Sequence, residues 1–155
     1  MNIYSYITKV NDSGCPYIVK KEIFKVDGRK TYKRPDEVAE FICDSLGIQD
    51  CAEEYLYSIC FDTKGHLIGC FEVSHGTVNL SLASPREIYQ KALMLGAVSI
   101  ILTHNHPSGD PTPSAADINL TKQVKQAGEM IGIPLLDHLI VSKRGWDSMN
   151  EGNLV

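Results

Sequence analysis

The chain has 155 residues, of which 43% are hydrophobic and 22% charged, and its net charge is −4. This length can bury a core of its own, and the composition is that of an ordinary globular protein. No apolar run approaches the roughly 20 residues that cross a bilayer, and the N-terminus lacks a signal-peptide pattern. We therefore expect a cytoplasmic protein without a membrane span, whose five cysteines are reduced and mostly buried.

The charge is distributed unevenly along the chain. Residues 1–34 hold eight Lys or Arg and three acidic residues, a net charge of +5, which leaves −9 for residues 35–155. Residues 15–23 are predicted to form a strand, followed by a turn at Asp27-Gly28. We interpret residues 1–34 as a basic N-terminal arm or hairpin. It could contact nucleic acid weakly or an acidic partner, or it could simply be a solvated strand pair.

Clearer secondary-structure patterns begin at Pro35, which can occupy the first position of a helix. Hydrophobic residues then recur at helical spacing until Gly47 ends the run. Residues 54–62 and 66–73 are predicted to form two antiparallel strands around a short turn. Residues 76–82 are predicted to form a third strand, because their hydrophobic residues alternate.

Two helices and two strands are predicted in the second half. Ser84 can cap a helix that begins with Pro85 and ends near Gly96. Residues 97–103 are apolar and β-branched and are predicted to form a central strand. A helix over 114–131 and a strand over 135–142 follow. Because helices and strands mix without a regular βαβ repeat, the pattern favours an α/β fold with a mixed β-sheet and flanking helices, not a doubly wound fold.

The segment between residues 103 and 117 carries the clearest chemistry. His104 and His106 are two residues apart as the chain leaves the predicted strand, so both side chains point to one side and can bind one ion. The loop that follows is rich in Pro and Gly and can turn the chain back sharply. That return would bring Asp117, in the first turn of the next helix, beside the histidines. A helix N-terminus favours the ionised carboxylate that a ligand needs.

Two imidazoles and one carboxylate form a nitrogen and oxygen site suited to zinc. Three protein ligands leave a fourth position for water, which is typical of a catalytic site, and zinc would lower the pKa of that water to about 7. Plainer interpretations exist, because H-x-H in a loop is often polar surface and Ser114-x-x-Asp117 is also a helix capping box. Capping and metal binding can coexist, and the combination favours the metal site.

A family resemblance rests on the same residues. His104-x-His106, seven residues, Ser114, two residues and Asp117 match the JAMM motif of MPN-type metalloproteases without a gap. The letters HNHPSGDPTPS at 104–114, SPRE at 84–87 and GIPLLDH at 132–138 resemble the RadC branch of that superfamily. The resemblance covers roughly residues 36–147, and we take residues 35–155 as a RadC-like JAB/MPN+ domain. It implies a cytidine-deaminase-like α-β-α sandwich.

The resemblance also implies roles for individual residues. His104, His106 and Asp117 would bind one Zn²⁺ ion. Ser114 would help hold the oxyanion of a tetrahedral intermediate, a contribution of about 3 kcal/mol. A glutamate at the start of the strand that precedes an Asp-Thr-Lys turn would activate the zinc-bound water, and counting back from Asp62 selects Glu54.

Two choices near this site stay open from the residues alone. Glu53 is the alternative base, but adjacent strand residues point to opposite faces, so only one of the two can face the metal, and we favour Glu54. Glu54 could also be an ordinary surface charge. Asp137 and His138 are expected to support the site or the fold. A fourth protein ligand would close the open position.

The resulting hypothesis is a zinc-dependent hydrolase, a peptidase or isopeptidase that cleaves an amide in a peptide or protein conjugate. The alternative is a RadC-like DNA-associated factor, for repair or mobile elements, in which the metal site is secondary. The helix-hairpin-helix module usual in RadC proteins is not found in this sequence, and the −9 charge of residues 35–155 argues against broad DNA affinity. A non-catalytic scaffold is a third possibility, against which the intact ligand set counts. Substrate and oligomeric state stay open.

Overall fold

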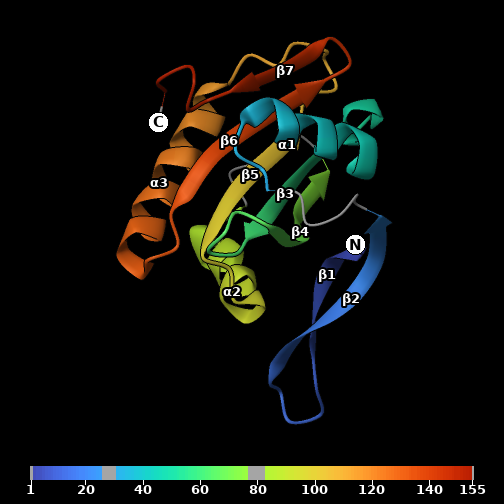
Figure 1. The fold of residues 1–155 in the computed structure, drawn as a ribbon, viewed down its shortest axis with the longest axis vertical. Helices are drawn as coiled ribbons and strands as arrows, with labels where there is room; N and C mark the ends of the chain where they lie inside the picture. The colour runs from blue at the N-terminus through green and yellow to red at the C-terminus, as the bar shows by residue number, and fades with distance from the viewer. Residues whose placement is uncertain (1, 26–30, 77–82, 155) are drawn as a thin grey trace.

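A mixed seven-stranded sheet runs through the computed structural model, which describes residues 2–25, 31–76 and 83–154 (Figure 1). The strand order is β2-β1-β4-β3-β5-β6-β7, in which β1 pairs with β4 and β5 with β6 in parallel and the other neighbours are antiparallel. The predicted mixed sheet is confirmed. The strands are β1 (Asn2–Val10), β2 (Pro16–Lys25), β3 (Glu54–Phe61), β4 (Leu67–Gly76), β5 (Ser99–Asn105), β6 (Leu135–Ser142) and β7 (Gly145–Ser148).

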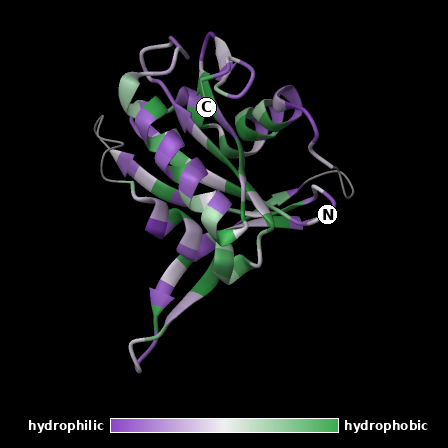
Figure 2. Cartoon of the chain, turned by 90° about the vertical axis from the view of Figure 1, so that its left-hand side faces the viewer, coloured by the Kyte–Doolittle hydropathy of each residue, from purple (hydrophilic) through white to green (hydrophobic). Residues whose placement is uncertain are grey.

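Helices cover both faces of this sheet, which confirms the predicted α-β-α sandwich (Figure 1). On one face lies α1 (Pro35–Phe41), which continues as a π-helical turn (Ile42–Leu46) and a 3-10 turn (Ile48–Asp50). On the other face lie α2 (Pro85–Leu95) and α3 (Ala115–Ile131), and the outer side of α3 is largely hydrophilic (Figure 2).

Alternation along the strands divides the core in two, because successive side chains point to opposite faces. The core on the α2 and α3 side includes Leu56, Cys60, Ile100, Leu102, Ile88, Ala92, Leu120 and Val124. The core on the α1 side includes Ile59, Phe61, Ile101, Leu139, Val38, Phe41 and Ile42.

The predicted helix boundaries agree with the structure. The Ser84 side chain accepts a hydrogen bond from the Glu87 N–H, and Pro85 follows as the first residue of α2. Ser114 caps α3 in the same way. Both helices end at a glycine in the left-handed region, Gly96 with φ +74° and Gly132 with φ +75°. A residue with a Cβ adopts that conformation at a cost, which explains why the helices stop there.

Two strand predictions needed correction. Residues 97–103 were expected to form the central strand, but β5 spans Ser99–Asn105. Ala97 instead takes part in the end of α2, because its N–H donates to the Ala92 carbonyl. At the other end β5 runs on, because His104 and Asn105 pair with β6. His104 therefore lies inside the strand and is fully buried.

A third strand was predicted over residues 76–82. Its first residue belongs to β4 and not to a separate strand. Gly76 is the last residue of β4, which pairs with the first residue of β3. Residues 77–82 lie outside the described residues. β4 thus begins one residue later and ends three residues later than the predicted 66–73 strand, because its pairing with β3 continues to Glu54, the first residue of β3.

The N-terminal segment forms a hairpin of β1 and β2 that projects from one edge of the sheet (Figures 1 and 2). The turn joins the two strands at residues 11–15, where the Asn11 side chain accepts hydrogen bonds from the Ser13 and Cys15 N–H groups. β1 pairs with β4 at Ser5 and Tyr6. The predicted turn at Asp27-Gly28 lies outside the described residues.

Two of the hairpin lysines contact other residues of the chain. Lys20 Nζ lies 3.8 Å from the centre of the Tyr4 ring, and Lys21 Nζ lies 3.6 Å from a Glu72 carboxylate oxygen. Arg29 and Lys30 lie outside the described residues. A nucleic-acid contact through residues 1–34 and a domain boundary after residue 34 both stay predictions. No helix in the described part of the chain is long and apolar enough to cross a membrane.

Close packing of α3 generates the first testable prediction. A Cβ at Gly128 would overlap the Tyr89 hydroxyl and lie 2.5 Å from the Ile133 carbonyl oxygen. We expect Gly128→Ala to lower the free energy of unfolding by about 2 kcal/mol, because contacts this close place the overpacking cost at the upper end of about 1–3 kcal/mol, and the gain in helix propensity offsets only about 1 kcal/mol of it. Urea unfolding measures this change.

The control is Glu129→Ala, an exposed position in the same helix, which should change the stability by less than about 0.5 kcal/mol. A Gly128→Ala protein as stable as the wild type would show that α2 and α3 are not packed as described.

Candidate metal centre

Three side chains predicted as metal ligands converge in the structure. Their ligand atoms all lie within 4.8 Å of one another. His104 Nε2 lies 3.3 Å from Asp117 Oδ1, His106 Nε2 lies 3.5 Å from Asp117 Oδ2, and the two Nε2 atoms are 3.0 Å apart. The loop after β5 therefore returns the chain as expected. These residues form a group that could hold a metal ion, and the identity of the ion stays a prediction.

The position of the proton on His106 follows from its neighbour. His106 Nδ1 lies 2.8 Å from the Asp110 carbonyl oxygen. A carbonyl only accepts hydrogen bonds, so Nδ1 must carry the proton. The neutral imidazole then has its lone pair on Nε2, the atom that faces Asp117.

His104 is oriented by a longer chain of hydrogen bonds. The Thr121 hydroxyl lies 2.5 Å from the Asp117 carbonyl oxygen, and a contact this short needs a proton from the hydroxyl. The Thr121 oxygen must then accept from His138 Nδ1 at 2.6 Å. His138 Nε2 is left to accept from His104 Nδ1 at 2.8 Å. The lone pair of His104 is therefore also on Nε2.

The chain requires a neutral His138, and its surroundings favour that form. His138 is fully buried, and burial lowers its pKa well below the usual value for histidine. The sequence predicted a supporting role for His138, and its contact with His104 agrees with that prediction. Thr121 was not predicted. It stands one helical turn after Asp117 on the same face of α3, which is the signal that could have found it.

The Nε2 lone pairs of His104 and His106 thus face the Asp117 carboxylate, and none of the three groups has a proton to donate to the others. Asp117 is 1% exposed. Burial alone would raise its pKa, but His104, His106 and Ser114 hold that pKa well below its usual range, so the carboxylate is ionised. Asp117 in turn raises the pKa of His106. The group therefore attracts a cation, for which a proton and a metal ion compete.

Asp117 caps α3, as the sequence predicted, and it also belongs to the group that could hold a metal ion. Its Oδ2 accepts from the Ser114 N–H at 2.7 Å, and its own N–H donates to Ser114 Oγ at 3.2 Å, which completes a capping box. Its Oδ1 takes no part in the box and faces His104. Ser114 is exposed, and its Oγ accepts from the Asp117 N–H. Its role in holding an oxyanion stays a prediction.

Glu54 is the first residue of β3, at the end of the sheet where the histidines lie. Leu56 stands opposite His104 and packs in the core on the α3 side. Because side chains alternate, Glu54 belongs to the same face as Leu56. Its negative charge contributes to the raised pKa of His106. Glu53 precedes the strand and is exposed. The choice of Glu54 as base stays a prediction that this register supports.

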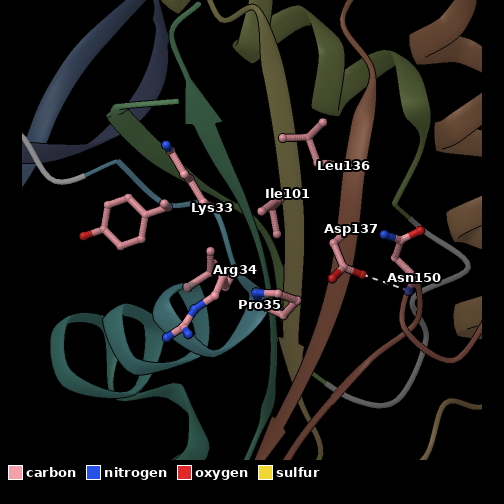
Figure 3. A pocket seen from close by; sticks show the side chains of 9 residues that line it. Lys33, Arg34, Pro35, Ile101, Leu136, Asp137 and Asn150 are labelled. Atoms are coloured by element: carbon pink, nitrogen blue, oxygen red, sulfur yellow. Dashed lines mark hydrogen bonds between the residues drawn. The ribbon is translucent and has the colours of Figure 1, made fainter. Parts of the chain in front are cut away.

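Asp137 lies on the other face of the sheet, beside a cavity of about 120 Å³ (Figure 3). Its carboxylate accepts hydrogen bonds from the Ser148 hydroxyl at 2.6 Å, the Asn150 N–H at 3.0 Å and the His138 N–H at 2.7 Å. The bonds from Ser148 and Asn150 tie the end of β7 and the chain just after it to β6, so Asp137 has a structural role. The cavity contains none of the predicted site residues and is lined by Tyr32, Lys33, Arg34, Pro35, Val38, Ile101, Leu136, Asp137 and Asn150.

Comparison with known proteins gives the family. Residues 32–154 match the family described as the RadC-like JAB domain. The chain belongs to this family. This RadC-like JAB domain is 46% identical over 118 residues to a UPF0758 protein of Finegoldia magna, 44% identical over 122 residues to one of Clostridium perfringens, and 38% identical over 131 residues to one of Thermotoga maritima.

The shared region is most of this chain but only part of each relative. It covers 76%, 79% and 80% of the RadC-like chain, and 52%, 53% and 59% of the three relatives in the same order. The chain thus spans about half the length of the relatives it matches. The hairpin of β1 and β2 lies before the residues that match the family.

The hydrogen-bond chain behind His104 generates the second prediction. Thr121→Val keeps the size of the side chain but removes the hydroxyl that accepts from His138, so His138 and His104 can adopt the wrong tautomers. We expect zinc affinity, measured by chelator competition, to fall by about 10- to 100-fold. Thr63→Val makes the same chemical change at an exposed turn and should leave affinity unchanged. Equal affinities for the two variants would refute the proposed orientation of His104.

Proposed function

We propose that this domain is a zinc-dependent hydrolase of the JAMM type that cleaves an amide bond in a peptide or protein conjugate. The observation that carries the proposal is the convergence of two imidazole nitrogens with free lone pairs and one ionised carboxylate. The Nδ1 protons of both imidazoles are donated to other groups, His138 and the Asp110 carbonyl. This donor set suits zinc better than a hard cation, which would favour an all-oxygen site.

Three protein ligands favour a catalytic site over a structural one, because structural zinc sites usually have four. His138 is the nearest further imidazole, and both of its ring nitrogens are committed, one to His104 and one to Thr121. In the described part of the chain, His104, His106 and Asp117 are the only His, Cys, Asp or Glu residues that cluster closely enough to hold a metal ion. One coordination position is then available to water or substrate.

The proposed mechanism uses two further residues of the chain. A bound zinc ion would supply a Lewis acid and lower the pKa of a water molecule. The Glu54 carboxylate takes the proton of the attacking water and delivers it to the nitrogen of the leaving amine. The Ser114 hydroxyl donates to the oxyanion that forms as the carbonyl carbon becomes tetrahedral. The carbon–nitrogen bond then breaks, and the products are a carboxylic acid and an amine.

Metal content tests the ligand assignment directly. Purified protein reconstituted with zinc should contain about one ion per chain, as expected for three protein ligands around one ion. His104→Ala should lose it, because the variant lacks one of three ligands. His66→Ala serves as the control, since His66 pairs with Asp62 at the turn between β3 and β4. A wild-type protein that binds no zinc would contradict the proposal.

A second test separates catalysis from metal binding. A screen of fluorogenic peptides and isopeptide-linked conjugates would identify a substrate. With that substrate, Glu54→Gln should retain zinc and lower kcat by about 10²- to 10⁴-fold, the contribution expected of a general base. Glu53→Gln should be close to the wild type. Full activity of Glu54→Gln would reject Glu54 as the base, and a loss confined to Glu53→Gln would transfer the role to Glu53.

A further inference from the structure

The residue between the two histidines connects them to the segment that carries Glu54. Asn105 is fully buried. Its Oδ1 accepts a hydrogen bond from the Tyr55 N–H at 2.7 Å, and its Nδ2 donates to the Glu53 carbonyl at 2.9 Å and lies 3.5 Å from the Cys51 carbonyl. The partners are about fifty residues away in the sequence.

These bonds hold the backbone on both sides of Glu54. One contact is to the residue before it and one to the residue after it, so the peptide groups that flank Glu54 are both bound to one side chain. An amide side chain is required, because the carbonyl oxygen must accept and the NH₂ group must donate. Aspartate would place a carboxylate oxygen against two carbonyls.

The ladder of β3 and β5 explains why such a contact is needed. The backbone pairing of the two strands ends at Leu56 and His104. Beyond this point the Asn105 side chain continues the connection that the β5 backbone no longer makes. Without it, residues 51–55 would be held mainly by the pairing of Glu54 and Tyr55 with β4.

We propose that Asn105 is a positioning residue for catalysis: it fixes the Glu54 carboxylate relative to the metal ligands on either side of Asn105. This inference rests on the proposed function, in which Glu54 is the base. The ligand strand and the base segment then move as one unit, and the separation of Glu54 from the metal site is set by a side chain that touches neither metal nor substrate. General-base catalysis depends on such placement, since the base must stay within hydrogen-bond reach of the proton it takes.

The test compares Asn105→Ala and Asn105→Asp with Asn119→Ala, an exposed asparagine on α3 that serves as the control. Asn105→Asp keeps the acceptor for the Tyr55 N–H and removes only the donors, so it carries the test if Asn105→Ala does not fold. Glu54→Gln is the reference for loss of the base.

Three measurements are made on each protein. Hydrogen exchange reports protection of the Tyr55 amide, chelator competition reports zinc affinity, and the visible spectrum of the cobalt-loaded protein over a range of pH reports ionisation at the metal. We expect Asn105→Ala to lower Tyr55 protection by at least about tenfold, a local opening of the segment. We expect zinc affinity within about threefold of the wild type, since the ligands themselves are retained. Both Asn105 variants should shift the pH profile in the same direction as Glu54→Gln, and Asn105→Ala should add nothing to Glu54→Gln.

Each other outcome identifies what has failed. A loss of zinc affinity of about 10-fold or more in both Asn105 variants would overturn the proposal, because Asn105 would then support the ligands and not Glu54. A wild-type pH profile for the Asn105 variants, with a shifted profile for Glu54→Gln, would overturn the positioning role alone. An unshifted profile for Glu54→Gln would overturn the proposed function and the positioning role together.

Discussion

The chemistry of this protein depends on where two protons are placed. His104 and His106 each have a neighbour that requires the proton on Nδ1, a buried imidazole for the first and the Asp110 carbonyl for the second. Both lone pairs are therefore on the Nε2 atoms, which lie 3.0 Å apart beside an ionised carboxylate. Such a group is unfavourable without a cation. The surrounding elements therefore have to hold the three side chains in place.

Those elements meet because β5 lies between β3 and β6 in the sheet. Parallel pairing with β6 brings His138 behind His104, and antiparallel pairing with β3 brings Glu54 to the same end. The first turn of α3 supplies Asp117 at this end of the sheet, and the following turn of α3 supplies Thr121. Four elements thus contribute to one site, and each also buries part of a core. The core packing and the placement of the site residues are consequently coupled.

Membership of the RadC-like JAB domain family is established over residues 32–154, and the hairpin of β1 and β2 extends the same sheet before that region. The hairpin joins the sheet at the edge formed by β4, where the ring of Tyr6 would contact any Cβ added at Gly69. This close fit explains why residue 69 is a glycine, and it makes the base of the hairpin part of the fold. The substrate and the partners of the domain are proposals, because the chain spans about half the length of its relatives.

The sequence by itself determined the helix ends, the mixed sheet and the three side chains that converge, because capping residues, glycines and alternation act through local geometry. It also indicated Asp117 as both cap and ligand. Tertiary structure alone decided that His104 lies inside a strand, that Thr121 and His138 orient it, and that Asn105 holds the segment of Glu54. These contacts join residues that are distant along the chain, and no local pattern specifies which buried polar groups will meet when the strands pair.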